Sequence, residues 1–327
     1  MGRLGLPFLF RYWERANAAS TGRQKETGEW DLECTLLAGL NLNVLETVRF
    51  LNPNDHPSFE AFEDWILATN GGAMDEVELS RLRRALAGER VGSPVGGLEC
   101  VRGLTQQELD FWDEHGYVVV HNAVAPANCD EAARAIYEFL DASPEVPESW
   151  YSRKYGVTIW VPLLRHPAFL ANRRSPRIVK AFSQLWGRED LWATVDQGGL
   201  NPPERADWKF PGPHVHWDAT IAPPHHLGMQ GILYLTDTPA HQGAFSCIPG
   251  FHRRLDEWLS SLPAGADPRE TLKREPGFQP IAGNAGDLII WHHLLPHGSS
   301  PNSGKLPRVA QYISMRPTRW QYTSEWV

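Results

Sequence analysis

The chain is poor in cysteine, in positive charge and in long apolar runs, and each shortage excludes a class of protein. It has only four cysteines in 327 residues, and no two of them form a Cys-x-x-Cys pair, so reduced thiols are expected in place of a disulfide framework. Lys and Arg number 31 against 39 Asp and Glu, and the resulting net charge of −8 argues against a nucleic-acid-binding protein. The sequence contains no run of about 18 apolar residues, so no membrane span is expected.

The first residues do not look like a targeting signal. A short apolar stretch ends at Arg11, Glu14 and Arg15, and no small-residue cleavage site follows it. We therefore expect no signal peptide and a cytoplasmic location. The apolar content of 42% and the charged content of 21% are those of an ordinary globular protein, long enough for one large domain and a smaller one.

Residues 1–90 predict a helical N-terminal domain. Apolar residues recur at helical spacing and form one stripe, which consists of Leu36, Leu37, Leu40, Val44, Leu45, Val48 and Leu51. Ser58 and Asp75 are suitable N-caps for two further helices. Residues 91–103 are rich in glycine and predict a linker.

Residues 104–327 predict a second domain that is mostly β, with flanking helices. Thr105 and Glu108 fit a capping box, and a strand is expected to begin at Tyr117. Pro176 and Gly187 mark the two ends of a later helix. Beyond residue 191, short apolar runs alternate with Gly, Pro and Asn, a pattern typical of a β-sandwich or barrel.

The sequence His216-Trp217-Asp218, followed much later by His297, is the most informative motif. Two histidines and one carboxylate make up the facial triad that holds non-heme Fe(II) and leaves positions open for substrate and O₂. If residues 216–218 form a strand, the side chains of His216 and Asp218 point to the same face. The pair alone is weak evidence, because two solvated loop residues would give the same letters.

Arg308 and Ser299 strengthen this interpretation and select among the nearby histidines. Arg308 follows His297 by 11 residues, so two antiparallel strands can bring its guanidinium back beside a metal. Ser299 precedes Arg308 by nine residues and can share a carboxylate with it. Of the other histidines, His292 and His293 are expected to be structural or pocket-lining. Substrate-side or surface positions are expected for His214, His225 and His226.

From Leu104 to about Pro317 the sequence resembles the phytanoyl-CoA dioxygenase family of Fe(II)- and 2-oxoglutarate-dependent oxygenases. Three blocks carry the resemblance: residues 104–120, residues 233–252 with Ile248-Pro249-Gly250-Phe251-His252, and residues 286–308. The second block departs from the family, which usually has Ser where Phe251 stands. The blocks occur in the family's order and cover about two-thirds of the chain.

The resemblance implies a double-stranded β-helix, that is, a cupin-like jelly roll, with iron inside. It implies that His216, Asp218 and His297 are the iron ligands and that Arg308 and Ser299 bind 2-oxoglutarate. Further co-substrate residues are carried over with less support, namely Gln197, Asn201 and Tyr234. The implied cofactors are Fe(II), 2-oxoglutarate and O₂.

The implied reaction is oxidation of an unactivated C–H bond of a small molecule or natural product, most simply its hydroxylation, with release of succinate and CO₂. Related halogenases have Gly or Ala at the position of Asp218, so halogenation is not expected. Two alternatives stay open: a jelly roll without turnover that acts as a binding or sensor module, and a cupin-type metal-dependent isomerase or hydrolase.

The substrate cannot be derived from these letters. Aromatic residues near the motif can line a pocket or belong to the core; they are Trp208, Phe210, Trp217, Tyr234, Phe245 and Trp291. Several arginines can meet an anionic substrate or be ordinary surface charges; they are Arg173, Arg174, Arg177, Arg253 and Arg254. The N-terminal helices are candidates for a homodimer contact or a carrier-protein contact.

Overall fold

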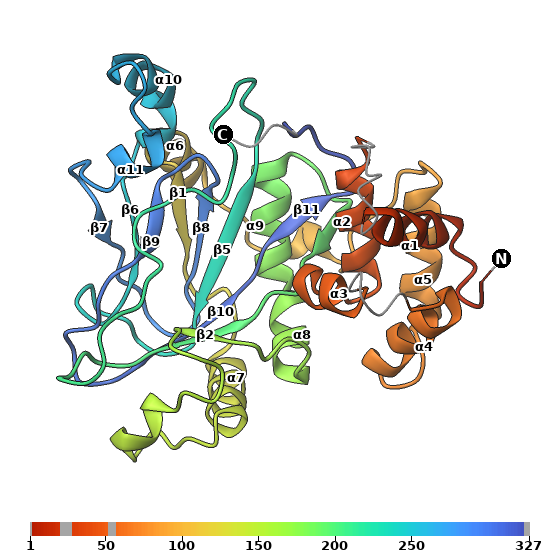
Figure 1. Ribbon diagram of the computed structural model, residues 1–327, viewed down its shortest axis with the longest axis horizontal. Helices are drawn as coiled ribbons and strands as arrows, with labels where there is room; N and C mark the ends of the chain where they lie inside the picture. Colours follow the sequence, from red (N-terminus) through yellow and green to blue (C-terminus); the bar gives the residue numbers. More distant parts are fainter. Residues whose placement is uncertain (1, 20–27, 52–56, 324–327) are drawn as a thin grey trace.

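A six-stranded antiparallel sheet crosses the centre of the computed structural model, which describes residues 2–19, 28–51 and 57–323 (Figure 1). Its strands occur in the order β1 (Tyr117–Val120), β8 (Leu288–His292), β5 (Met229–Tyr234), β10 (Arg308–Tyr312), β4 (Gly198–Asn201) and β2 (Trp160–Val161). The strands expected at Tyr117, Gly231, Leu288 and Val309 are all present.

Both faces of this sheet are buried. Successive side chains of a strand point to opposite faces, so the apolar run of β8 contributes to two cores. Leu288 and Ile290 join one buried cluster, whereas Ile289 and Trp291 join another. A strand that is buried on both faces needs a continuous apolar run. A strand with one face in solvent would instead alternate apolar and polar residues.

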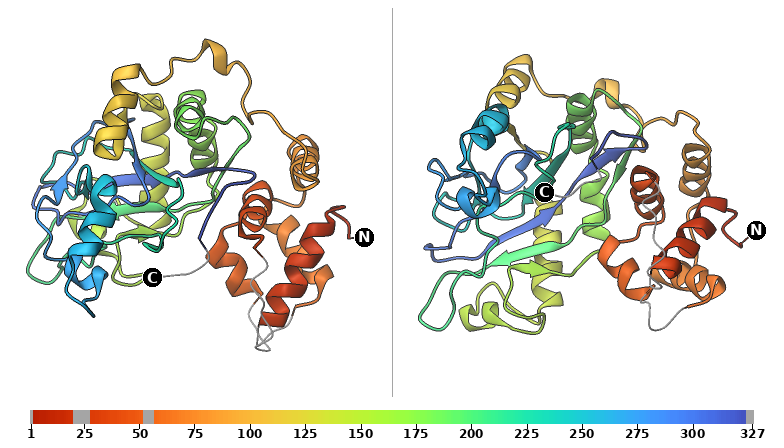
Figure 2. Two further views of the ribbon diagram at one scale, coloured as in Figure 1. Left: turned by 90° about the horizontal axis from the view of Figure 1, so that it is seen from above. Right: turned by 45° about the horizontal axis from the view of Figure 1, so that its top comes forward.

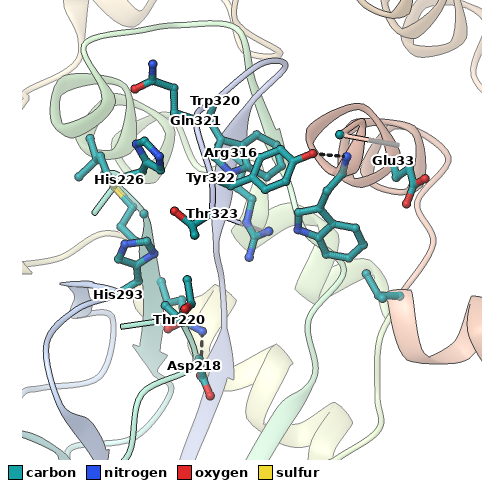
Figure 3. A pocket seen from close by; sticks show the side chains of 18 of the residues that line it. Glu33, Asp218, Thr220, His226, His293, Arg316, Trp320, Gln321, Tyr322 and Thr323 are labelled. Carbon is teal, nitrogen blue, oxygen red and sulfur yellow. Dashed lines mark hydrogen bonds between the residues drawn. The ribbon is translucent and has the colours of Figure 1, made fainter. Parts of the chain in front are cut away.

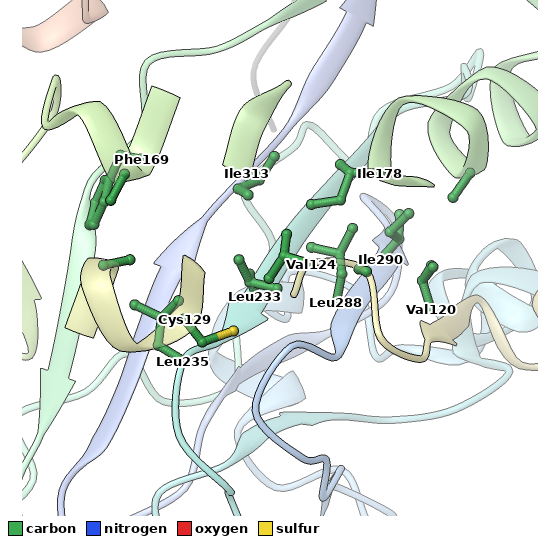
Figure 4. Packing of buried hydrophobic residues seen from close by; sticks show 14 of the residues in the cluster. Val120, Val124, Cys129, Phe169, Ile178, Leu233, Leu235, Leu288, Ile290 and Ile313 are labelled. Atoms are coloured by element: carbon green, nitrogen blue, oxygen red, sulfur yellow. The ribbon is translucent and has the colours of Figure 1, made fainter. Parts of the chain in front are cut away.

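Helices cover one face of the sheet (Figures 2 and 4). They are α6 (Gln106–His115), α7 (Pro126–Phe139), α8 (Pro167–Arg173) and α9 (Pro176–Trp186). The capping box of Thr105 and Glu108 opens α6 as predicted, and Gly187 ends α9 in the left-handed conformation with a φ of 63°. Figure 4 shows the packing of Phe169 and Ile178 against strand residues such as Leu233 and Ile290.

A three-stranded sheet lies over the other face, to the left in Figure 1. Its order is β7 (Gln279–Pro280), β6 (Phe245–Cys247) and β9 (His297–Ser299), with α10 (Phe251–Ser261) and α11 (Pro268–Leu272) beside it. A separate pair is formed by β3 (Leu191–Ala193) and β11 (Met315–Pro317).

The N-terminal helices pack around a core of their own, to the right of the sheets in Figure 1. They are α1 (Pro7–Ala19), α2 (Trp30–Gly39), α3 (Val44–Phe50), α4 (Phe59–Thr69) and α5 (Glu76–Leu86). The predicted caps are present, because Ser58 accepts a hydrogen bond from the backbone of Ala61 and Asp75 accepts from that of Val77. A short 3₁₀ helix, Leu98–Cys100, interrupts the predicted linker.

The single apolar stripe predicted between residues 36 and 51 is wrong. Asn43 caps a new helix by accepting a hydrogen bond from the backbone of Glu46, so the stripe is divided between α2 and α3. After the change of direction Leu45 and Val48 are 62% and 57% exposed. The apolar residues keep helical spacing across the turn between α2 and α3, so their spacing alone does not reveal that the helix ends there.

The expectation of a mostly β chain is met only in part, because the described residues form a mixed fold of antiparallel sheets and helices. No helix within the described residues is long and apolar enough to cross a membrane.

Candidate metal centre and adjoining pocket

His216 and His297 lie on adjacent antiparallel segments. The backbone N–H of His216 donates to the carbonyl of His297 at 2.9 Å, and the reverse bond measures 3.0 Å. His297 begins β9, and a turn lies just before it. The expected strand through His216 and Asp218 is wrong, because the chain makes one isolated bridge at His216 and then bends.

The bend nevertheless brings the three predicted ligands together. His216 Nε2 lies 3.1 Å from Asp218 Oδ1, and His297 Nε2 lies 3.4 Å from Asp218 Oδ2. One ligand atom from each residue fits within a group no more than 4.8 Å across. Two imidazole nitrogens and one carboxylate oxygen form a donor set that suits Fe(II).

Backbone carbonyls fix the orientation of both histidines. His216 Nδ1 lies 2.7 Å from the carbonyl of His214, and His297 Nδ1 lies 3.0 Å from that of Leu295. Because a carbonyl can only accept, each Nδ1 carries the proton and each Nε2 is left to face the centre.

Gln230 on β5 holds the carboxylate, with its Nε2 donating to Asp218 Oδ2 at 3.0 Å. Nothing in the sequence pattern pointed to Gln230, because the contact joins a strand to a loop that only the tertiary fold brings near.

The electrostatics favour an ionised carboxylate. Burial alone would raise the pKa of Asp218, but hydrogen bonds from His216 and His297 outweigh it and hold the pKa well below its ordinary value. For His216, burial would lower the pKa, yet the bond to Asp218 and its charge raise it. The two histidines therefore surround the negative charge of Asp218. A metal cation can balance this charge in place of protons.

Arg308 is completely buried beside this centre. Its Nη1 donates to Ser299 Oγ at 3.3 Å, so the two residues lie close enough to share a carboxylate, although β9 and β10 belong to different sheets. Its Nε and Nη2 are buried without a hydrogen-bond partner among the described residues. A buried guanidinium with free donors fits a carboxylate, which would supply both the missing charge and the missing acceptors. The dicarboxylate 2-oxoglutarate has this chemistry.

The remaining predicted co-substrate residues lie on neighbouring strands. Asn201 pairs with Arg308 in the register of β4 and β10, and its Oδ1 is buried without a partner. The carbonyl of Gln197 accepts from Tyr312 N at 3.0 Å, just before β4. Tyr234 is fully buried; its hydroxyl donates to Ile281 O and accepts from Phe245 N, so both roles of that hydroxyl are already occupied by backbone.

A pocket of about 820 Å³ extends from Asp218 toward the N-terminal helices (Figure 3). Its aromatic lining consists of Tyr12, Trp30, Trp186, Trp320 and Tyr322. None of the six aromatic residues singled out near the motif lines it; all six are buried in the core. His225 and His226, expected on the substrate side or at the surface, line it, and so does His293, which was expected to be structural or pocket-lining.

The five arginines considered for an anionic substrate do not line this pocket. Arg173 is buried and donates to the carbonyls of Leu164 and Asp196. Arg254 pairs with Glu275 at 2.8 Å. The pocket instead contains Arg316, which the sequence did not distinguish from other arginines.

A profile of the phytanoyl-CoA dioxygenase family (PhyH) matches residues 112–310, more than half of the chain. The chain belongs to the phytanoyl-CoA dioxygenase family. The match contains the triad and Arg308, as the resemblance implied, but excludes α1–α5 and the C-terminal segment from β11 onward.

Two named relatives each match 64% of this chain. A "Putative phytanoyl-CoA dioxygenase" of Dictyostelium discoideum is 23% identical over 264 residues, covering 64% of this chain and 74% of the relative. The "Ava biosynthesis cluster protein O" of Aspergillus versicolor is 22% identical over 240 residues, covering 64% and 77%.

Among solved structures, the epimerase SnoN is similar, with a TM-score of 0.50 and 19% identity over 66% of this chain and 85% of SnoN. That structure contains Fe³⁺, alpha ketoglutarate and nogalamycin RO. In this member of the family, the cluster of His216, Asp218 and His297 could hold a metal ion.

Proposed function

We propose that this protein is an Fe(II)- and 2-oxoglutarate-dependent dioxygenase that hydroxylates, or otherwise oxidises, an unactivated C–H bond of a small molecule. One observation carries the proposal: a compact triad of His216, Asp218 and His297 lies beside the buried, under-partnered guanidinium of Arg308. Membership of the phytanoyl-CoA dioxygenase family supports it.

The triad would hold Fe(II), and Arg308 with Ser299 would bind the distal carboxylate of 2-oxoglutarate. When bound, iron and 2-oxoglutarate supply oxidation of a C–H bond by O₂ with release of succinate and CO₂. The carbonyls of His214 and Leu295 keep each Nε2 aimed at the centre.

Neighbouring residues would complete the co-substrate site. The unpaired Oδ1 of Asn201 and the side chain of Gln197 are proposed as polar contacts for 2-oxoglutarate. Tyr234 is proposed as an apolar wall, because its hydroxyl already has backbone partners. Asp218 occupies the position that halogenases leave open, so hydroxylation is proposed in preference to halogenation.

The arrangement of strands supports a double-stranded β-helix for residues 104–327. The six-stranded sheet forms one side and the three-stranded sheet, extended by the bridge at His216, forms the other, with the triad between them. We further propose residues 1–90 as a helical domain and 91–103 as its linker. A cytoplasmic location and a homodimer or carrier-protein contact through the N-terminal helices stay predictions.

Anaerobic calorimetry tests the proposal. Wild-type protein should bind one Fe(II) and then 2-oxoglutarate, with little 2-oxoglutarate bound before metal is added. Asp218→Ala removes the carboxylate ligand of the proposed triad. It should therefore weaken Fe(II) binding by at least about a hundredfold and abolish metal-dependent 2-oxoglutarate binding. A Gln106→Ala variant on exposed α6 is the matched control.

Equal 2-oxoglutarate binding by metal-free protein, or by Asp218→Ala, would contradict the assignment. Tight binding of both groups without any consumption of 2-oxoglutarate across a panel of substrates would favour the sensor alternative. Turnover in the absence of O₂ would favour the cupin-type isomerase or hydrolase.

A further inference from the structure

We propose that segments outside the family match turn the pocket at Asp218 into a binding site for an aromatic, multi-ring substrate that carries an anionic group, and that Arg316 binds this anion. The inference deepens the proposed function and rests on it, since Asp218 is taken as the metal end of the pocket. Figure 3 shows Arg316 extending from β11 between Asp218 and Glu33.

Two segments far apart in sequence build the wall opposite the metal centre. Helices α1–α3 contribute Tyr12, Trp30 and Val48, and the C-terminal segment contributes Trp320 and Tyr322. All of these residues lie outside residues 112–310. The wall therefore lies outside the part of the chain that the family profile matches, whereas the triad and Arg308 lie inside it.

Hydrogen bonds join the two segments into one surface. The backbone N–H of Trp30 donates to the hydroxyl of Tyr322 at 2.9 Å (Figure 3). Thr35 Oγ1 donates to the carbonyl of Thr318 at 3.1 Å and is almost completely buried. Such contacts hold the pocket open in a defined shape before any ligand arrives, which reduces the entropic cost of binding.

The positive charge of Arg316 is not neutralised inside the pocket. Its Nη1 lies 3.7 Å from Cys34 Sγ, and its guanidinium lies 5.4 Å from the ring of Trp320. Burial raises the pKa of Cys34 to about 11, so this partner is a neutral thiol near pH 7. No carboxylate among the described residues forms an ion pair with Arg316.

The other charged groups of the wall are already paired. Glu33 accepts from Arg15 Nη2 at 2.7 Å, and Arg15 Nη1 also pairs with Glu29 at 2.8 Å. Burial lowers the pKa of His293 to about 4, so this neighbour is uncharged at neutral pH. An anionic group on the substrate would give Arg316 the partner that the protein itself does not supply.

The aromatic part of the substrate follows from the lining and the volume. Trp30 is 40% exposed and Val48 is 57% exposed, and both line the pocket, so they offer apolar surface that a ligand can cover. A volume of about 820 Å³ suits a ligand of several fused or linked rings. Flat indole and phenol rings provide stacking faces for such a ligand.

A matched pair of probes tests the inference. The affinities of 2-naphthoate and of its neutral analogue 2-naphthamide are measured by anaerobic calorimetry on protein saturated with Fe(II) and 2-oxoglutarate, so that the Arg308 site is occupied. Wild type should bind the anion more tightly than the amide. Arg316→Gln should weaken 2-naphthoate by at least tenfold and leave 2-naphthamide within about twofold.

Three further variants separate the roles. Arg316→Lys keeps the charge and should retain part of the preference for the anion, which guards against a folding defect in Arg316→Gln. Trp30→Ala should weaken both probes, because it removes a shared stacking face. Arg308→Met should lose 2-oxoglutarate binding; measured without 2-oxoglutarate, it should keep the preference for 2-naphthoate, because Arg316 is unchanged.

The inference is overturned if wild type binds neither probe, if it shows no preference for the anion, or if Arg316→Gln leaves that preference intact. These outcomes are distinguishable from failure of the proposed function. If the proposed function fails, wild-type protein does not bind Fe(II) and 2-oxoglutarate together, whether or not it binds the probes.

Discussion

At the scale of the residue, the proposed binding role of Arg308 would explain an energetic cost in the fold. A fully buried guanidinium with two unpartnered nitrogens is expensive to keep in a folded chain. Its neighbour Ser299 offers one hydroxyl, which cannot balance a full charge. The cost is understandable if a carboxylate from outside completes the site.

Replacing Arg308 by Met should therefore separate stability from binding. Without 2-oxoglutarate, the melting temperature of Arg308→Met should equal or exceed that of wild type, because an unpaired buried charge is removed. With Fe(II) bound, 2-oxoglutarate should raise the melting temperature of wild type only. Anaerobic scanning fluorimetry measures both quantities.

Ser299→Ala serves as the comparison for Arg308→Met. It removes a single hydrogen-bond partner and should weaken 2-oxoglutarate by only a few-fold, on the order of 1 kcal/mol. A strongly destabilised Arg308→Met protein that still responds fully to 2-oxoglutarate would show that the guanidinium is structural.

At the scale of the element, one buried amide links helix α8 to strand β10. Gln311 Oε1 accepts from Asn172 Nδ2 at 2.9 Å, and Gln311 Nε2 donates to the carbonyl of Phe169 at 3.0 Å. Gln311 lies in the same strand as Arg308, so this link also fixes the strand that carries the proposed co-substrate anchor.

Gln311→Met keeps the size of the side chain and removes both hydrogen bonds. The carbonyl of Phe169 and the amide of Asn172 would then be buried without these partners, at a cost of about 1–3 kcal/mol in the free energy of unfolding. Urea denaturation measures the loss, with Gln106→Met on the exposed face of α6 as a control expected to stay within about 0.5 kcal/mol. A loss no larger than the control's would mean that solvent replaces the missing partners.

At the scale of the whole molecule, buried histidines make the fold sensitive to acid. Burial lowers the pKa of His292 to about 3 and that of His293 to about 4. In the unfolded chain both titrate near their ordinary value of about 6.5. Between pH 6.5 and 4 the unfolded state therefore binds more protons, and stability falls as the pH falls.

The acid sensitivity can be measured as the free energy of unfolding at a series of pH values. Each of the two histidines should contribute a slope of up to about 1.4 kcal/mol per pH unit below pH 6.5. His292→Asn should reduce the slope, because its amide oxygen can still accept the hydrogen bond that His292 Nδ1 takes from Leu294 N at 3.1 Å. An exposed histidine supplies the control, His241→Asn, which should leave the slope unchanged; an equal slope in His292→Asn would move the effect to other groups.

Local signals were enough for much of the secondary structure. Thr105 with Glu108, Ser58, Asp75 and Gly187 act within a few residues along the chain, and each was found where predicted. Residues 36–51 failed because Asn43 starts a new helix without breaking the apolar spacing. The periodic spacing of apolar residues shows which face of a helix is buried, but it does not show where the helix ends and the chain turns.

By itself, the sequence determined the family, and it predicted two groups of residues that the structure brings together: His216, Asp218 and His297 in one cluster, and Arg308 next to Ser299. These groups were predictable because few residue types can bind a metal or a carboxylate. Only the tertiary structure decided what stands around them. Gln230 reaches the loop residue Asp218 from strand β5. Arg316 shares a pocket with helices nearly 300 residues earlier in the chain, and the hydrogen bond between Trp30 and Tyr322 joins the same two parts of the chain. Contacts between distant segments depend on how sheets and helices pack, and no local pattern of letters records that packing.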